Sequence, residues 1–446
     1  MNGLRNHHRK HDIAVIAEVL FQCADQATFL GQLRTRAIAA PHYDLVDLAK
    51  LDQRLEAHID GLRIAGDEGW QLCRKELDWK EPGEVFAAAV LAFESGVEQR
   101  IAEVLKLATA SPELSRGVIS ALGWLDYEQA EPHIKNLCAS DSPARRRMGI
   151  AAAAVHRKDP GRALQDATSD ADPLLKARAL RAVGELGRVD LVPLIQHEVN
   201  REPSAKDKDR NKDKDTDKDE GCRFWAAWSI ALLAGYTNAV QVLQSFAQST
   251  SPYRERALQL ALRRLDINSA HAWHQQLAKN PRSARAAVVG AGVIGDPTLI
   301  TWLIDQMSVP PLSRVAGEAF TMITGVDIAY EDLDGEKPEG FESGPTENPE
   351  DEDVEMDPDE RLPWPDSKLI AMWWEKHVGG FQGGMRYLLG KPISVEGMHQ
   401  VLRSGGQRQR AAAALELAIL QPGEPMFEVR APGFRQQEML KFATAG

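Results

Sequence analysis

Three glycines in the stretch VVGAGVIGD have the spacing of a dinucleotide-binding turn. Gly290, Gly292 and Gly295 satisfy the pattern GxGxxG. Such a turn holds a pyrophosphate only where a strand precedes the glycines and a helix grows from them. Pro297 would fall inside that helix and interrupt it. We therefore expect no nucleotide cofactor at these glycines.

The other signatures of catalysis are incomplete. Gly390 and Lys391 resemble the end of a phosphate-binding loop, but Met385 stands where its first glycine is needed and Pro392 replaces its serine or threonine. The metalloprotease pattern HExxH and the hydrolase pattern GxSxG are absent from the sequence. The sequence therefore predicts a protein that is not an enzyme and has no catalytic residue.

Three aspartates, Asp213, Asp215 and Asp217, have the spacing of the first calcium ligands of an EF-hand. That loop needs a glycine at its sixth position and a bidentate glutamate at its twelfth, where this sequence has Lys218 and Phe224. The cysteines, which form neither a CxxC pair nor a dense disulfide framework, are Cys23, Cys73, Cys138 and Cys222. We expect no metal, no cofactor and a reducing, cytoplasmic location.

The charge of the chain is concentrated in one acidic tract. The formal net charge is −12, but residues 331–360 contain fifteen acidic side chains and a single base, Lys337. The remainder is close to neutral, so it gives no general attraction for nucleic acid. The longest uncharged stretch, 224–253, is apolar only as far as Ala234, and eleven residues fall short of the ~20 that cross a bilayer. We expect no specific nucleic acid partner and no membrane span.

Prolines recur along the middle of the chain with a period of about 30 residues. They are Pro82, Pro112, Pro143, Pro173, Pro252, Pro281 and Pro311, with successive spacings of 30, 31, 30, 79, 29 and 30. The spacing of 79 equals two periods plus about nineteen residues, which correspond to a polar tract at 201–220. The chain therefore contains an internal repeat with one insertion.

Each period has the signals of two short helices. Proline suits the first turn of a helix, and glycine suits the left-handed residue that follows one. A basic residue follows most of the prolines by three to five positions, and glycine recurs fourteen positions after them, as at Gly96, Gly187, Gly295 and Gly325. Two short helices cannot bury their apolar faces alone, so successive units must stack. Only Met426 to Arg430 has the alternation of a strand.

The register of PELSRGVISALGWL and PLLKARALRAVGELG is similar to that of short bacterial HEAT-like repeats. We predict an all-α protein, an α-solenoid of HEAT-like helical hairpins of about 30 residues. Residues 1–81 would form an N-terminal helical cap, and 82–329 a repeat array with a disordered Lys/Asp loop at 201–220. Residues 330–365 would form a disordered acidic linker, and 366–446 a C-terminal HEAT-like helical region.

Motifs near both ends of the chain carry a closer resemblance. They are LDQRLEAHIDGLRIAGDEGW at 51–70, GGMRYLLGKPIS at 383–394 and QRQRAAAALELAIL at 407–420. Together they resemble a bacterial HEAT-repeat family of unassigned activity whose genes often accompany type VI secretion genes. The resemblance implies a cytoplasmic, non-enzymatic adaptor or chaperone that handles a secreted effector or a spike component. The expected partner is thus a protein.

We expect partner contacts in two groups of residues. The terminal motifs contain many charged residues near helix ends, and the 30-residue repeat does not require a charge at these positions. They are Arg54, His58, Asp60, Arg63, Arg386, Arg403, Arg408 and Arg410. These residues would either contact a partner or cap the exposed end faces of the array. A second group lies on the second helices of the repeats, at positions expected to be exposed and concave: Lys135, Gln165, Gln196, Gln276 and Asp305.

The alternative is an enzyme built on a HEAT scaffold, such as a DNA glycosylase-like or bilin lyase-like protein. Glycosylases of this kind line a concave surface with tryptophan, aspartate and basic residues. Trp225, Trp228, Trp273 and Trp302 are present here, but at apolar helix positions where core packing explains them. The helical stretches also have no sustained basic run. The adaptor hypothesis is therefore preferred.

Overall fold

The computed structural model describes residues 16–200, 214–344 and 357–442. Over these residues the protein is all-α, with 22 α-helices and a single two-stranded sheet. Two compact units can be distinguished: residues 1–35 with 50–133, and residues 36–49 with 134–446. The second unit contains most of the segment expected to form repeats, together with the C-terminal region.

The first unit contains most of two long helices and the first two helix pairs. Its elements are α1 (Ala17–Ala37), α2 (Leu45–Ile64), α3 (Asp67–Glu76), η1 (Leu77–Trp79), α4 (Pro82–Ser95), α5 (Glu98–Ala108), α6 (Pro112–Trp124) and the start of α7 (Tyr127–Cys138). Helix α4 is the central element, because it packs against α3, α5 and α6. Its buried residues include the alanines Ala87, Ala88, Ala89 and Ala92 and the valines Val85 and Val90.

The second unit continues the alternation of helices. First helices are α8 (Pro143–Val155), α10 (Pro173–Glu185), α12 (Lys214–Ala234), α14 (Arg254–Arg264), α16 (Ala284–Ile294) and α18 (Pro310–Thr324). Second helices are α9 (Arg162–Ala167), α11 (Val192–Val199), α13 (Thr237–Ala247), α15 (Ile267–Ala278) and α17 (Ile300–Met307). The 3₁₀ turns η2 (Val189–Leu191), η4 (Pro281–Ser283) and η5 (Pro297–Leu299) join some of them. Successive first helices pack on one another and form most of the core.

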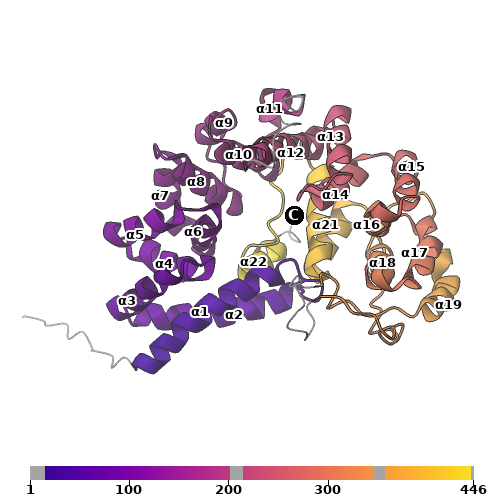
Figure 1. The fold of residues 1–446 in the computed structure, drawn as a ribbon, viewed down its shortest axis with the longest axis horizontal. Coiled ribbons are helices and arrows are strands. Elements are labelled where there is room, and N and C mark those ends of the chain that lie inside the picture. Colours follow the sequence, from indigo (N-terminus) through magenta and orange to yellow (C-terminus); the bar gives the residue numbers. More distant parts are fainter. Residues whose placement is uncertain (1–15, 201–213, 345–356, 443–446) are drawn as a thin grey trace, which may run out of the picture. The chain divides into compact units, whose positions relative to one another are not determined.

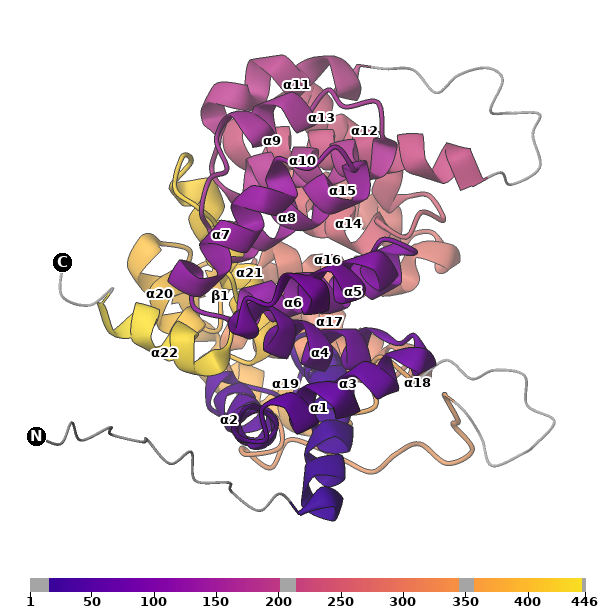
Figure 2. The same cartoon turned by 90° about the vertical axis from the view of Figure 1, so that its left-hand side faces the viewer.

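The C-terminal region completes the second unit. It comprises α19 (Ser367–His377), η6 (Val378–Gly380), an antiparallel pair of β1 (Tyr387–Leu388) and β2 (Lys391–Pro392), α20 (Val395–Ser404), α21 (Gln407–Leu420) and α22 (Gly433–Phe442). Helices α20, α21 and α22 form one group (Figure 2) with its own small core. Helix α21 packs on α12, on the side of the first helices opposite α11, α13, α15 and α17 (Figure 1).

Proline and glycine have the predicted local roles. Four first helices begin at Pro82, Pro112, Pro143 and Pro173, and α18 begins at Pro310. The glycines predicted to follow first helices have left-handed φ angles, with 69° at Gly187, 73° at Gly295 and 78° at Gly325. Gly292 lies inside α16, where a Cβ atom would approach the Ala319 Cα atom of α18 to 3.0 Å. The GxGxxG pattern therefore ends a helix, whereas a dinucleotide site begins one.

Two expectations about local structure require correction. The Lys/Asp tract was expected to be a loop over 201–220, but α12 begins at Lys214, and 201–213 lie outside the described residues. Helical growth from the apolar segment that follows extends the helix into the polar tract. Met426 to Arg430 forms no strand, and the strands are β1 and β2 instead.

The described parts of the acidic linker pack against the first helices. Asp359 accepts two hydrogen bonds from Arg285, at 2.6 and 2.8 Å, and Asp357 pairs with Arg314. The Arg314 guanidinium also lies 4.4 Å from the ring of Trp364. The expectation of a disordered linker rests on composition, because acidic residues are usually solvated. It requires correction, since arginines of α16 and α18 pair with Asp359 and Asp357. Residues 345–356 lie outside the described residues.

No helix among the described residues is long and apolar enough to cross a membrane.

Replacing Gly295 by alanine should destabilise the protein more than replacing Gly96. Both glycines are left-handed residues after a first helix, which costs an alanine about 1 kcal/mol. A Cβ at Gly295 would lie 2.3 Å from the Tyr387 carbonyl oxygen, whereas a Cβ at Gly96 would meet nothing within 4 Å. We expect a total loss of about 3 kcal/mol for Gly295→Ala. Urea unfolding followed by circular dichroism measures both, and equal losses would contradict the proposed close approach.

Candidate functional site

The C-terminal region binds to the exposed ends of the first helices. A helix leaves its last four carbonyl groups without partners inside the helix. The Leu389 and Gly390 amides donate to the Met322 and Ile323 carbonyls of α18, at 2.7 and 2.9 Å. The Met426 amide donates to the Glu185 carbonyl at the end of α10, at 3.0 Å. The region therefore caps first helices that are distant from one another in the sequence.

Arg386 caps two further helix ends with its side chain. Its guanidinium donates to the Ile294 carbonyl of α16 at 3.1 Å and to the Arg263 carbonyl of α14 at 3.2 Å. A cation is favoured at such ends because the helix dipole makes them negative. Arg386 also pairs at 2.6 Å with Glu416 of α21, and Glu416 pairs at 3.1 Å with Arg263. Burial lowers the pKa of Arg263 to about 10, so its guanidinium stays protonated at pH 7.

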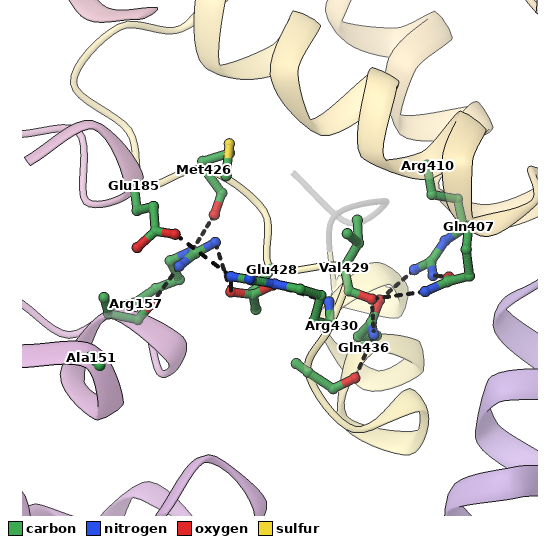
Figure 3. A network of polar contacts seen from close by, with 12 residues as sticks. Ala151, Arg157, Glu185, Gln407, Arg410, Met426, Glu428, Val429, Arg430 and Gln436 are labelled. Atoms are coloured by element: carbon green, nitrogen blue, oxygen red, sulfur yellow. Dashed lines mark hydrogen bonds and ion pairs between the residues drawn. The ribbon is translucent and has the colours of Figure 1, made fainter. Parts of the chain in front are cut away.

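Two buried carboxylates, Glu185 and Glu428, lie among arginines (Figure 3). Glu185, at the end of α10, pairs with Arg178 at 2.9 Å and with Arg181 at 2.8 Å. Glu428, in the non-helical stretch between α21 and α22, pairs with Arg430 at 2.7 Å. This group of residues, together with Arg157 and Arg256, is called the arginine cluster below.

Arg157 and Arg430 connect the two carboxylates. The Arg157 guanidinium lies 3.1 Å from Glu428 and donates to the Met426 carbonyl. Arg430 lies 3.6 Å from Glu185 in addition to its contact with Glu428. The cluster thus joins the ends of α8 and α10 to the C-terminal region through charge-assisted hydrogen bonds.

The arginines keep both carboxylates ionised despite burial. Burial alone would raise the pKa of Glu428, but the charges of Arg430 and Arg157 lower it to about 2. Burial would likewise raise the pKa of Glu185, and the charges of Arg178 and Arg181 lower it well below its ordinary range. Burial lowers the pKa of Arg181 to about 9, although Glu185 acts in the opposite direction. Glu185, Glu428 and Arg181 are therefore charged at pH 7.

A second polar network surrounds Arg410, whose side chain is completely buried. Its guanidinium donates to the Leu402 carbonyl at 2.7 Å and to the side chains of Gln407 and Gln436. Gln436 in turn donates to the Val429 carbonyl at 2.9 Å (Figure 3). Arg410 forms no ion pair with any described carboxylate, so neutral oxygens alone solvate this charge.

The predicted site residues of the first unit have unequal surroundings. Arg63 of α2 donates two hydrogen bonds to Glu94 of α4, at 2.7 and 2.8 Å, and also contacts Glu56 and Asp60. Those contacts join two helices of the same unit. Arg54 is exposed, and His58 is half-buried. In this group only Arg54 and Asp60 are exposed for contact with a partner.

The predicted arginines of the C-terminal region all make contacts inside the second unit. Arg408 pairs with Glu318 of α18 at 2.9 Å and donates to the Ala39 carbonyl at 3.1 Å. Arg403 donates to the Leu440 carbonyl at 3.4 Å, and Arg386 has the capping role described above. The expectation that Arg410 contacts a partner requires correction, because its burial excludes direct contact in this conformation.

The second group of predicted residues lies on the outer helices. Lys135, Gln165, Gln276 and Asp305 are exposed, and Gln196 is half-buried. The expected concave position of Gln165, Gln196, Gln276 and Asp305 requires correction, because α9, α11, α15 and α17 lie on the side of the first helices opposite α21 (Figure 1). The sequence does not determine which helix of a pair faces the C-terminal region.

Sequence reasoning missed the arginine cluster. Glu185 is the last residue of a predicted first helix that is rich in alanine and leucine. An acidic residue at such a place indicates a buried charge that needs a basic partner. Nothing local links it to Glu428, because the contact depends on the path of the whole C-terminal region. Among the described residues, no group of three or more histidine, cysteine, aspartate or glutamate side chains could hold a metal ion.

Comparisons with models of protein families, with curated proteins and with solved structures give no significant match to this chain.

Replacing Glu428 by glutamine should destabilise the protein at pH 7 and less so at low pH. The folded-state pKa of about 2 lies below the ordinary value of 4.5, so Glu428 stabilises the fold above pH 4.5 and loses this effect as the pH falls toward 2. The difference in unfolding free energy between wild type and E428Q should shrink by about 2 kcal/mol from pH 7 to pH 3. Urea unfolding measures it. Glu375→Gln, at an exposed position of α19, is the control; a constant difference for E428Q would contradict the ion pairs.

Charge reversal at Arg410 should be far more damaging than at Arg408. A glutamate at position 410 would be buried against the acceptors Leu402, Gln407 and Gln436, which we expect to cost more than about 4 kcal/mol. Arg408 is partly exposed, so R408E should cost about 1 to 2 kcal/mol through repulsion from Glu318. Thermal unfolding compares the two. A normal melting temperature for R410E would contradict the buried position.

Proposed function

We propose that the chain is a protein-binding adaptor whose helix pairs are HEAT-like units of an α-solenoid. The support is the alternation of first and second helices in each unit, with first helices packing on one another. Such stacking produces long surfaces made from equivalent positions of successive repeats. Surfaces of this kind suit extended or folded protein partners.

The observation that carries the proposal is how the second unit binds its own polypeptide. The non-helical stretch between α21 and α22 lies against the ends of α8 and α10 through the Met426 amide and carbonyl groups. Side-chain specificity comes from Glu428, which forms ion pairs with Arg157 and Arg430. The non-helical stretch is thus held by backbone hydrogen bonds together with one charged side chain, which is a recurring way of binding a peptide. The C-terminal region thus occupies the inner side of the first helices.

A partner would therefore bind the outer side. We call the outer row the following residues of α7, α9, α11, α15 and α17, of which all but Gln196 are exposed: Lys135, Gln165, Gln196, Gln276 and Asp305. A row of exposed polar residues is typical of interfaces that form and dissociate.

The resemblance of the terminal motifs supports a role beside type VI secretion. On that basis the partner is a secreted effector or a component of the secretion spike, which the adaptor holds or delivers in the cytoplasm. The proposal includes no catalytic step, so its chemistry is that of a reversible protein interface.

Affinity capture tests this function. The protein, carrying an affinity tag, is recovered from a bacterium that is assembling its type VI apparatus, and co-purified proteins are identified by mass spectrometry. We expect a secretion component with wild type and at least tenfold less of it with the double variant Gln276→Arg, Asp305→Arg. The physical reason is that two added positive charges disrupt the outer row without touching the core.

Gln400→Arg is the matched control, because Gln400 is an exposed glutamine on α20, in the C-terminal region. It should capture the partner as wild type does. Recovery of no secretion component while the apparatus is expressed would refute the adaptor function. Equal capture by the double variant would refute the outer row as its interface.

A further inference from the structure

The arginine cluster contains more positive than negative charge. Five guanidinium groups, those of Arg157, Arg178, Arg181, Arg256 and Arg430, surround the two buried carboxylates. Glu255 also acts on Arg256, but both residues are exposed, so solvent screens their interaction. Arg178 and Arg181 are mostly buried, with 15 % and 24 % of their side chains exposed. Their charges are screened less, and an excess of such charge favours a bound anion.

Two of these arginines lie beside one aromatic ring, and a third shares a carboxylate with one of them. The guanidinium of Arg181 is 4.7 Å from the ring of Trp225, and that of Arg256 is 5.8 Å from the same ring. Arg178 and Arg181 share Glu185. The positive charges of Arg178 and Arg256 both lower the pKa of Arg181, which is consistent with this proximity.

Hydrogen-bond donors remain available in this group. The Nη1 atom of Arg178 is buried and has no hydrogen-bond partner. Arg256 forms no ion pair with the described residues, and its side chain is exposed at the edge of the cluster. A buried donor without an acceptor costs about 1 to 3 kcal/mol. A ligand with several acceptor oxygens, entering beside Arg256, would satisfy these groups.

We propose that Arg178, Arg181 and Arg256 form a binding site for a phosphoryl group beside Trp225. A phosphoryl group has up to two negative charges and three acceptor oxygens. It can therefore compensate the excess positive charge of these arginines more fully than a single carboxylate, which has one negative charge. The planar guanidinium groups suit such oxygens. The group would come from a free phosphate ester or from a phosphorylated side chain. This site lies on the first helices and is independent of the outer row.

The test uses the purified full chain and needs no partner, so its failure would leave the adaptor function untouched. Binding of inorganic phosphate and of phosphoserine is measured by calorimetry, and thermal unfolding is followed in parallel at one ionic strength set with sodium chloride. We expect both ligands to bind and to raise the melting temperature, because they bind only the folded state. A phosphoserine peptide and glycerol phosphate, a free ester, are compared in the same way: tighter binding of the peptide identifies a phosphorylated side chain as the source, and tighter binding of glycerol phosphate a free ester.

Arg256→Gln is the principal variant, because this residue is exposed and forms no ion pair that folding needs. It should weaken phosphate binding about tenfold, which is the loss of one charged hydrogen bond. Arg162→Gln, at a residue of α9 whose side chain is 90 % exposed, should bind as wild type does. Phosphate that stabilises no more than sodium chloride would overturn the proposal. Equal binding by R256Q, or acetate binding as tightly as phosphate, would also overturn it.

Discussion

Unsatisfied carbonyl groups at the ends of the first helices determine much of the second unit. Every helix must place its last carbonyls against water, a neighbour or a side chain. In an array of stacked pairs these ends fall in one row. Here the C-terminal region supplies the donors, as backbone amides at α10 and α18 and as the Arg386 guanidinium at α14 and α16. The region is thus held by hydrogen bonds that each helix end requires.

The charged side chains that join the C-terminal region to the first helices lie next to groups of opposite charge. The cationic Arg386 lies at negative helix ends, and Glu416 compensates it from α21. Glu428 enters a group of arginines in the same way. The consequence is that Arg386 and Glu428 are engaged inside the second unit. The exposed outer helices are better placed than these arginines to meet a partner.

The sequence predicted the helix pairs well and their long-range contacts poorly. Proline and glycine act locally, so Pro173 and Gly187 predicted the start of α10 and the residue that follows it. Asp359 illustrates the limit. Composition places it in a disordered acidic tract, yet it pairs with Arg285, 74 residues earlier. Such a pair needs knowledge of the chain path, and a single sequence with a repeating pattern offers many equivalent arginines.

The candidate site also depends on contacts that a local sequence pattern does not reveal. Arg410 is a charged residue near a helix end and was therefore predicted to contact a partner, but the structure buries it completely. Its partners Gln407 and Gln436 are neutral, so no pattern of opposite charges revealed the network. Arg181 and Trp225 lie on different helices, α10 and α12, and each has a sufficient structural explanation when considered alone.

The position of Met426 has a consequence for biosynthesis. Arg157 donates to its carbonyl across 269 residues of sequence. At roughly 5 to 20 residues per second, a ribosome would take roughly 15 to 50 seconds to add that length of chain. During this interval α8 and α10 exist without the segment that covers their ends. A nascent chain of this protein must therefore remain soluble with open helix ends, and chaperones that recognise such intermediates have a defined period in which to act.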